Sequence, residues 1–168
     1  MLYFSELKGK KIITEDGVKV GKLSDLIFLA TDHPAITKSA VKTVSHLYII
    51  VPIQYVSKIN GEIVLQKNYL STELSENELF VVKNLLDKQI IDIQGNKIVR
   101  VNDVIFQNKP SLYIAGVDIG LLGILRWLKV ERIVFQLFLH LKIKLTSQFL
   151  SWGYIQPLEL ARGRVKLK

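Results

Sequence analysis

The stretch "EDGVKVGKLSDLIF", residues 15–28, is nearly repeated 78 positions later as "IQGNKIVRVNDVIF", residues 93–106. When the comparison is extended to residues 7–28 and 85–106, the alignment needs no gap and nine of the 22 pairs are identical. A gapless match at a fixed period is typical of a structural unit that the chain uses twice. We therefore expect one small fold in two copies.

Each copy has the pattern of a β-hairpin. Asp16-Gly17 predicts a two-residue turn in the first copy, because glycine adopts positive φ values without steric cost. Gly95 keeps the glycine in the second copy, where Gln94 replaces the aspartate. β-branched and aliphatic residues flank both turns, as expected for strands.

The apolar pattern of the first copy changes parity after its turn. Val18 and Val20 alternate, but the next apolar residue, Leu23, lies three positions further on. This change predicts a bulge or bend near Gly21-Lys22. Bends of this kind curl a sheet, so we expect each copy to form a small β-barrel.

Asp25 and Asp103 occupy the same position in the two copies. A carboxylate there could act in catalysis or ligate a metal, but each copy has no histidine or second acid at a useful spacing. We therefore expect both side chains to accept backbone N–H groups where the strand bends. Together with Gly17 and Gly95, they are predicted to be structural positions of the repeat.

Later segments of the two copies also correspond. "VPIQYVSKI", residues 51–59, aligns with "LSWGYIQPL", residues 150–158, and the offset grows from 78 to about 100. The second copy is therefore expected to contain an insertion. The predicted organisation is a mainly β chain of two tandem barrels with a helical insertion in the second, and its segments are 1–72, a linker at 73–78, 79–168 and an insertion at about 120–145.

The end of the linker allows two local structures. Ser75-x-x-Glu78 matches a capping box, which would open a short helix. In contrast, "ELFVV", residues 78–82, aligns with "MLYFS", residues 1–5, and would form a strand that enters the second copy. The repeat favours the strand.

The insertion, residues 120–145, is the only long helical candidate, because its leucines and isoleucines follow helical spacing. Its longest uncharged run is the nine residues 133–141, against roughly 20 needed to span a bilayer. The helix would either pack across the barrel as added core, or dock on an anionic membrane surface or a partner helix. The residues of its candidate contact surface are Leu125, Leu128, Val134, Phe135, Leu137, Phe138 and Leu141.

The chain of 168 residues is basic, with 23 Lys+Arg against 15 Asp+Glu and a formal net charge of +8. This balance is typical either of a solubilising surface or of a chain with polyanionic partners such as nucleic acid, anionic lipid or an acidic protein. The basic tail "ARGRVKLK", residues 161–168, alternates charged with aliphatic residues, which is the pattern of a half-exposed strand. It therefore disfavours direct nucleic-acid binding.

Motifs that carry chemistry are missing from the sequence. Without cysteine, neither a disulfide framework nor a thiolate metal site can form. The three histidines have no partner at ligand spacing, and no phosphate-binding loop, zinc-protease motif or nucleophile elbow occurs. We expect no catalytic residue, no metal ligand, no cofactor and no small-molecule substrate, so the chain is predicted not to be an enzyme.

The first copy resembles the PRC-barrel through "DGVKVGKLSDL", residues 16–26, and "VPIQYV", residues 51–56. This small barrel occurs in the photosynthetic reaction centre H subunit and in the ribosome-maturation protein RimM. The second copy contains "IAGVDIGLLGILRWL", residues 114–128, and "WGYIQPLE", residues 152–159. It is similar to the tandem barrels that precede the helical and CBS domains of proteins related to MgtE-type magnesium transporters.

The resemblance implies a non-enzymatic interaction or regulatory module in the cytoplasm, at the cytoplasmic face of the membrane. Its partners would be another protein or the helical and CBS domains, which would follow Lys168. The alternative is a RimM-like adaptor in RNA processing or ribosome assembly. RimM carries its barrel singly, so the tandem arrangement favours the first function. Neither resemblance implies metal ligands, and neither predicts an oligomeric state.

Overall fold

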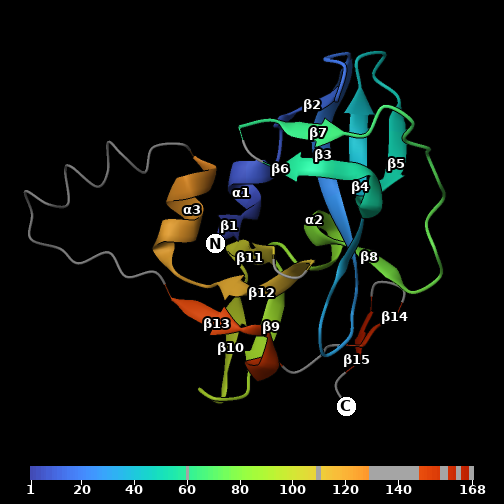
Figure 1. The fold of residues 1–168 in the computed structure, drawn as a ribbon. Coiled ribbons are helices and arrows are strands. Elements are labelled where there is room, and N and C mark those ends of the chain that lie inside the picture. The colour runs from blue at the N-terminus through green and yellow to red at the C-terminus, as the bar shows by residue number, and fades with distance from the viewer. Residues whose placement is uncertain (60, 109–110, 129–147, 156–158, 162–163, 167–168) are drawn as a thin grey trace, which may run out of the picture.

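A computed structural model describes residues 1–59, 61–108, 111–128, 148–155, 159–161 and 164–166. The fold is mainly β, with short helices between strands (Figure 1). The N-terminal elements are β1 (Leu2–Tyr3), α1 (Phe4–Leu7), β2 (Lys11–Thr14), β3 (Lys19–Leu29), β4 (Ile36–Thr43), β5 (Tyr48–Pro52), the 3-10 turn η1 (Ile53–Tyr55), β6 (Val56–Ile59) and β7 (Ile63–Leu65).

The second half begins with the same kinds of element in the same order. They are β8 (Glu78–Phe80), α2 (Val81–Asn84), β9 (Gln89–Asp92), β10 (Lys97–Arg100), β11 (Asp103–Asn108), β12 (Leu112–Asp118), α3 (Leu121–Trp127), β13 (Phe149–Ser151), the 3-10 turn η2 (Trp152–Tyr154), β14 (Glu159–Ala161) and β15 (Arg164–Lys166). β10 and β11 together take the place of the long strand β3.

The strands of the described residues form two larger sheets and two strand pairs. The first sheet has the order β5-β4-β3-β2-β7-β6, with β8 also paired to β3. The second has the order β1-β11-β12-β13, while β9 pairs with β10 and β14 with β15. Most neighbours are antiparallel, but β2 and β7 run parallel. In the described part of the chain no sheet closes on itself, so the expected barrel closure is not observed.

The two halves exchange their first strands. β1 pairs with β11 of the second half, with Leu2 opposite Phe106, and β8 pairs with β3 of the first half, with Leu79 opposite Phe28. The predicted strand at "ELFVV" is thus present as β8, and α2 follows it. The exchange makes each half depend on the other for one edge of its sheet.

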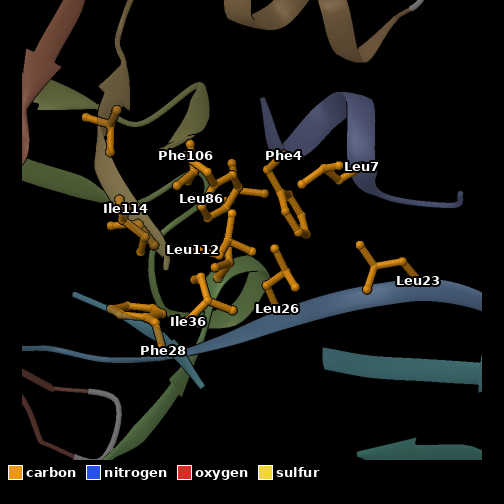
Figure 2. Packing of buried hydrophobic residues seen from close by; sticks show 14 of the residues in the cluster. Phe4, Leu7, Leu23, Leu26, Phe28, Ile36, Leu86, Phe106, Leu112 and Ile114 are labelled. Atoms are coloured by element: carbon orange, nitrogen blue, oxygen red, sulfur yellow. The ribbon is translucent and has the colours of Figure 1, made fainter. Parts of the chain in front are cut away.

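One hydrophobic core serves both halves. Phe4 and Leu7 of α1 are buried beside Leu86 and Phe106 of the second half, and Leu26 of β3 lies in the same cluster (Figure 2). The rings of Phe4 and Phe106 meet edge-on with centroids 6.3 Å apart. Since apolar burial is the main stabilising contribution to folding, we infer that the halves stabilise one another.

The first hairpin has a longer turn than the predicted two residues. The N–H of Thr14 donates to the carbonyl of Val18 (2.9 Å), which leaves a three-residue loop that ends at Gly17. Gly17 has φ +82°, so glycine is required there, as expected. The longer loop has a local cause, because the Thr14 hydroxyl binds both the Asp16 carboxylate and the N–H of Val18.

In the second hairpin the left-handed residue is not Gly95, which corrects the sequence prediction. Asn96 adopts φ +48° instead, and asparagine is one of the residues that tolerate this region. Gly95 instead lies close to the side chain of Asp92. Its N–H donates to the Asp92 carboxylate (2.9 Å), and a Cβ on Gly95 would lie 2.5 Å from the other carboxylate oxygen.

The predicted bend in β3 is distributed over both sides of Gly21-Lys22. Pairing with β2 skips Val20, and pairing with β4 skips Ser24. Gly21 itself lies against β4, where a Cβ would come within 2.2 Å of the Lys42 carbonyl oxygen. The sequence therefore indicated the bend, but the bulges flank the expected position.

The predicted helical insertion lies largely outside the described residues. The described part is α3, a helix of seven residues. Of the candidate contact residues, Leu125 is half-buried and Leu128 is exposed, while Val134, Phe135, Leu137, Phe138 and Leu141 lie outside the described ranges. None of the helices in the described ranges has the length and apolar character needed to traverse a bilayer.

Candidate functional site

The two repeated aspartates lie where the halves meet. Asp25 accepts hydrogen bonds from the N–H of Leu26 (2.8 Å) and from the N–H of Val82 in α2 (3.1 Å). Asp103 accepts the corresponding bonds from Val104 (2.9 Å) and from Ser5 in α1 (3.1 Å). The expected backbone hydrogen bonds are therefore present. Each aspartate also caps the short helix of the opposite half, which the sequence did not predict.

In the second half this aspartate belongs to a buried ionic network. The Arg126 guanidinium of α3 donates to Asp103 (3.2 Å) and to Asp118, and the Ser5 hydroxyl donates to Asp103 (2.6 Å). The Tyr3 ring covers the guanidinium at 3.7 Å. The side chain of Arg126 is 7% exposed and those of both aspartates are 0% exposed. The network fixes α3 to β11, β12 and the N-terminal segment.

Burial and hydrogen bonding compete at these charged groups. Burial raises the pKa of Asp103 above its usual range, although hydrogen bonds from Ser5, Val104 and Arg126 oppose that rise. Burial alone would lower the pKa of Arg126, but hydrogen bonds to Asp118 and Asp103 outweigh it and raise the pKa. The arginine therefore stays charged and compensates the two carboxylates.

The described residues of the first half form no such network around Asp25. Asp25 pairs across the ladder with Ala40, where Asp103 pairs with Asp118. Burial raises the pKa of Asp25 to about 6, and the N–H groups of Val82 and Leu26 offset only part of this effect. Among the described residues, backbone donors hold the first carboxylate, and the charge of Lys8, rather than an arginine, also lowers its pKa.

A groove of about 460 Å³ lies at the same junction. Its lining residues are Lys8, Val82, Leu86, Asp87, Arg100, Asn102, Ile124 and Trp127. The Trp127 indole N–H donates to the Asn102 carbonyl (3.0 Å), which fixes the ring, and the Lys8 ammonium lies 5.2 Å from its centroid. The groove therefore combines an apolar wall with cationic groups.

Helix α3 extends this apolar surface beyond the groove. Leu121, Ile124 and Leu128 are all exposed, and their spacing of three and four residues places them on one face of the helix. Ile124 also lines the groove. Exposed apolar residues that adjoin a groove form a surface suited to a partner rather than to solvent.

Several of these residues were missed by the sequence analysis, in particular Lys8, Asp118, Arg126 and Trp127. One signal was available, because Arg126 is the only charged residue in the apolar run "LLGILRWL", residues 121–128. A lone charge in an apolar helix is usually buried with a partner. The described residues contain no cluster of three or more histidine, cysteine, aspartate or glutamate side chains that could hold a metal ion.

Comparison with known families bears on the first half of the chain. Residues 1–69 match the PRC-barrel domain. The matched PRC-barrel residues contain β1 to β7 and Asp25, while Asp103, Asp118 and Arg126 lie beyond them. No curated protein matches the chain. The fold prediction is thus confirmed at the level of a mainly β chain with a PRC-barrel domain.

Proposed function

We propose that the chain is a non-enzymatic interaction module and that the groove beside α3 is its contact site for a protein partner. The observation that carries this proposal is the continuous apolar surface formed by the exposed face of α3 and the groove. Trp127 provides a large, fixed aromatic anchor in the groove, and such anchors dominate binding energy at protein interfaces.

The charges around the groove define the complementary partner. Lys8 and Arg100 border it, and the pair between Arg100 and Asp87 is solvent-exposed. An exposed pair is weak and is readily exchanged for another acidic partner. The partner that fits is therefore an amphipathic helix with an apolar stripe flanked by acidic residues.

We also propose that the second half is a second PRC-type barrel repeat with a helical insertion at about residues 120–145. The gapless sequence repeat, the common order of elements and the 3-10 turns η1 and η2 support this. The sequence similarity of residues 85–159 favours a regulatory module of the MgtE-related kind, in the cytoplasm at the membrane face. Helical and CBS-type domains would then supply the partner segment.

Site-specific photo-cross-linking would test the contact site. A photoreactive amino acid is placed at Ile124 or Leu128 and, as the control, at Leu70, which is also exposed but is not among the residues that line the groove. We expect one protein adduct from both positions 124 and 128 and none from position 70. The purified partner should then lose at least tenfold in affinity for the Ile124→Asp variant.

The identity of the cross-linked protein also distinguishes the two functional alternatives. A CBS-type or transporter-related protein would support the regulatory module, and a ribosomal protein would instead establish the RimM-like adaptor. The proposal of a contact at α3 would be abandoned if positions 124 and 70 gave the same adducts. An unchanged melting temperature of Ile124→Asp would show that the variant is folded.

A further inference from the structure

A row of lysines crosses the first sheet at its hairpin end. Lys11 of β2 lies opposite Lys22 of β3, Lys22 lies opposite Lys42 of β4, and Lys42 lies opposite Tyr48 of β5. Residues directly opposite in a ladder share one face of the sheet, so the three ammonium groups stand side by side. All three lysines are exposed. We call Lys11, Lys22 and Lys42 the lysine row.

Among the described residues, no carboxylate forms an ion pair with the lysine row. The ion pairs in the described part of the chain use other lysines and arginines. The two acids of the adjacent turn are engaged elsewhere, because Glu15 accepts the Ser57 hydroxyl (2.6 Å) and Asp16 lies 3.6 Å from Lys67. Like charges directly opposite one another destabilise a sheet, so the lysine row is better explained as a binding surface for anions.

A hollow of about 300 Å³ lies beside the row and is also cationic. Its walls include Lys19, Lys22, Lys42 and His46. This concentration of positive charge on one small surface accounts for part of the excess of basic over acidic residues in the sequence. The hollow is also far in sequence from α3.

Exposed aliphatic side chains project from the turns at the same end. Val18 follows the β2–β3 turn, and Val44 and Leu47 form the β4–β5 turn, with exposed fractions of 58 to 66%. The N–H of Val44 donates to the carbonyl of Val20 (3.1 Å), so the two turns are adjacent, as seen where both emerge at the top of Figure 1. We call Val18, Val44 and Leu47 the hairpin tips.

We propose that the lysine row and the hairpin tips together dock the chain on an anionic lipid bilayer. The tips would enter the boundary between headgroups and acyl chains, and the lysines would contact lipid phosphates. Lysines behind an apolar edge are the arrangement that binds anionic interfaces. Single-stranded nucleic acid fits less well, because its binding sites combine basic grooves with aromatic stacking platforms, whereas the tips are aliphatic and Lys42 lies over the Tyr48 ring (5.9 Å).

Vesicle flotation of the full chain would test this proposal. The probes are vesicles of phosphatidylcholine with 30% phosphatidylserine (about the anionic content of an inner leaflet) and vesicles of phosphatidylcholine alone. We expect binding to the anionic vesicles only. Each lysine near such a surface contributes about fivefold, so Lys22→Gln with Lys42→Gln should weaken binding by roughly 25-fold.

Matched control variants separate the effect of this site on vesicle binding from the effect of the overall positive charge. Lys88→Gln with Lys97→Gln removes the same charge from exposed positions of the second half and should weaken binding by less than about threefold. Val44→Ser with Leu47→Ser should abolish the part of the binding that persists at high salt. Ile124→Asp, which tests the α3 contact, should leave vesicle binding unchanged.

Three outcomes would overturn the proposal. These are no preference for anionic vesicles, equal losses in the two lysine pairs, and vesicle binding that still persists at high salt when Val44 and Leu47 are both serine. Binding of a single-stranded oligonucleotide that depends on the lysine row, without vesicle binding, would assign the surface to nucleic acid instead.

Discussion

Asp25 and Asp103 hold equivalent positions in the two halves, yet their surroundings differ. Both cap a helix of the opposite half through a backbone N–H. Only Asp103 is joined by a second acid and an arginine, and this network fixes α3. The hydrogen bonds that both aspartates make to a helix of the opposite half thus join the two halves. The network of Asp103, Asp118 and Arg126 positions α3, which has no counterpart among the described elements of the first half. The helix that the second half added is also the one that carries the proposed protein contact.

The largest expected effect comes from removing the arginine of the network. Arg126→Met leaves two buried carboxylates without a cation, and breaking a buried ion pair in this way costs about 3–5 kcal/mol. Urea unfolding would measure the loss in free energy of unfolding. Arg100→Met removes an arginine whose ion pair is exposed, so it should cost less than about 1 kcal/mol. Similar losses in the two variants would contradict the structural role of Arg126.

The complementary change adds a second buried acid to the first half without adding an arginine. Ala40→Asp places a carboxylate opposite Asp25, at a buried position with no arginine like Arg126, and should cost about 2–4 kcal/mol at pH 7. Ala40→Asn has nearly the same size but no charge. If the two variants were equally destabilised in urea unfolding, size rather than charge would explain the loss.

The pH dependence of stability should show the titration of Asp25. Because the pKa of Asp25 is raised from 3.8 to about 6 in the folded chain, the folded state retains this proton longer than the unfolded state. Its contribution to the free energy of unfolding is therefore complete below pH 3.8 and declines as the pH rises to about 6. The decline corresponds to roughly 3 kcal/mol at most.

Asp25→Asn removes this titration. Relative to the wild type, the variant should gain stability between pH 4 and pH 7, as measured by urea unfolding at both values. A parallel shift at the two pH values would show that Asp25 is already ionised at pH 4, and the raised pKa would be wrong.

The smallest effects concern the hairpin turns. Gly17→Ala should cost about 1 kcal/mol, because Gly17 has φ +82° and no neighbouring atom would obstruct the added methyl group. In the second half Asn96 has the positive φ, so Asn96→Gly should change the free energy of unfolding by less than about 0.5 kcal/mol. Thermal unfolding of both variants would test this difference between the turns.

The sequence by itself determined the local structure of this protein. The repeat identified both hairpins and the strand that begins at Glu78, since apolar alternation and glycine positions depend on residues close in the chain. It also indicated that Asp25 and Asp103 would accept backbone hydrogen bonds. These features follow from steric and hydrogen-bonding preferences that need no knowledge of distant segments.

Only the tertiary structure decided which half each first strand would join. Because the halves are so similar, β1 could in principle pair with the edge of β3 or with the edge of β11. The local sequence pattern does not distinguish these two pairings. The network of Asp103, Asp118 and Arg126 likewise depends on how α3 returns over β11 and β12. The lysine row depends on the register of three strands, with Lys42 brought beside Lys22 by the ladder. Contacts of this kind are set by the packing of whole elements, which the order of residues alone does not specify.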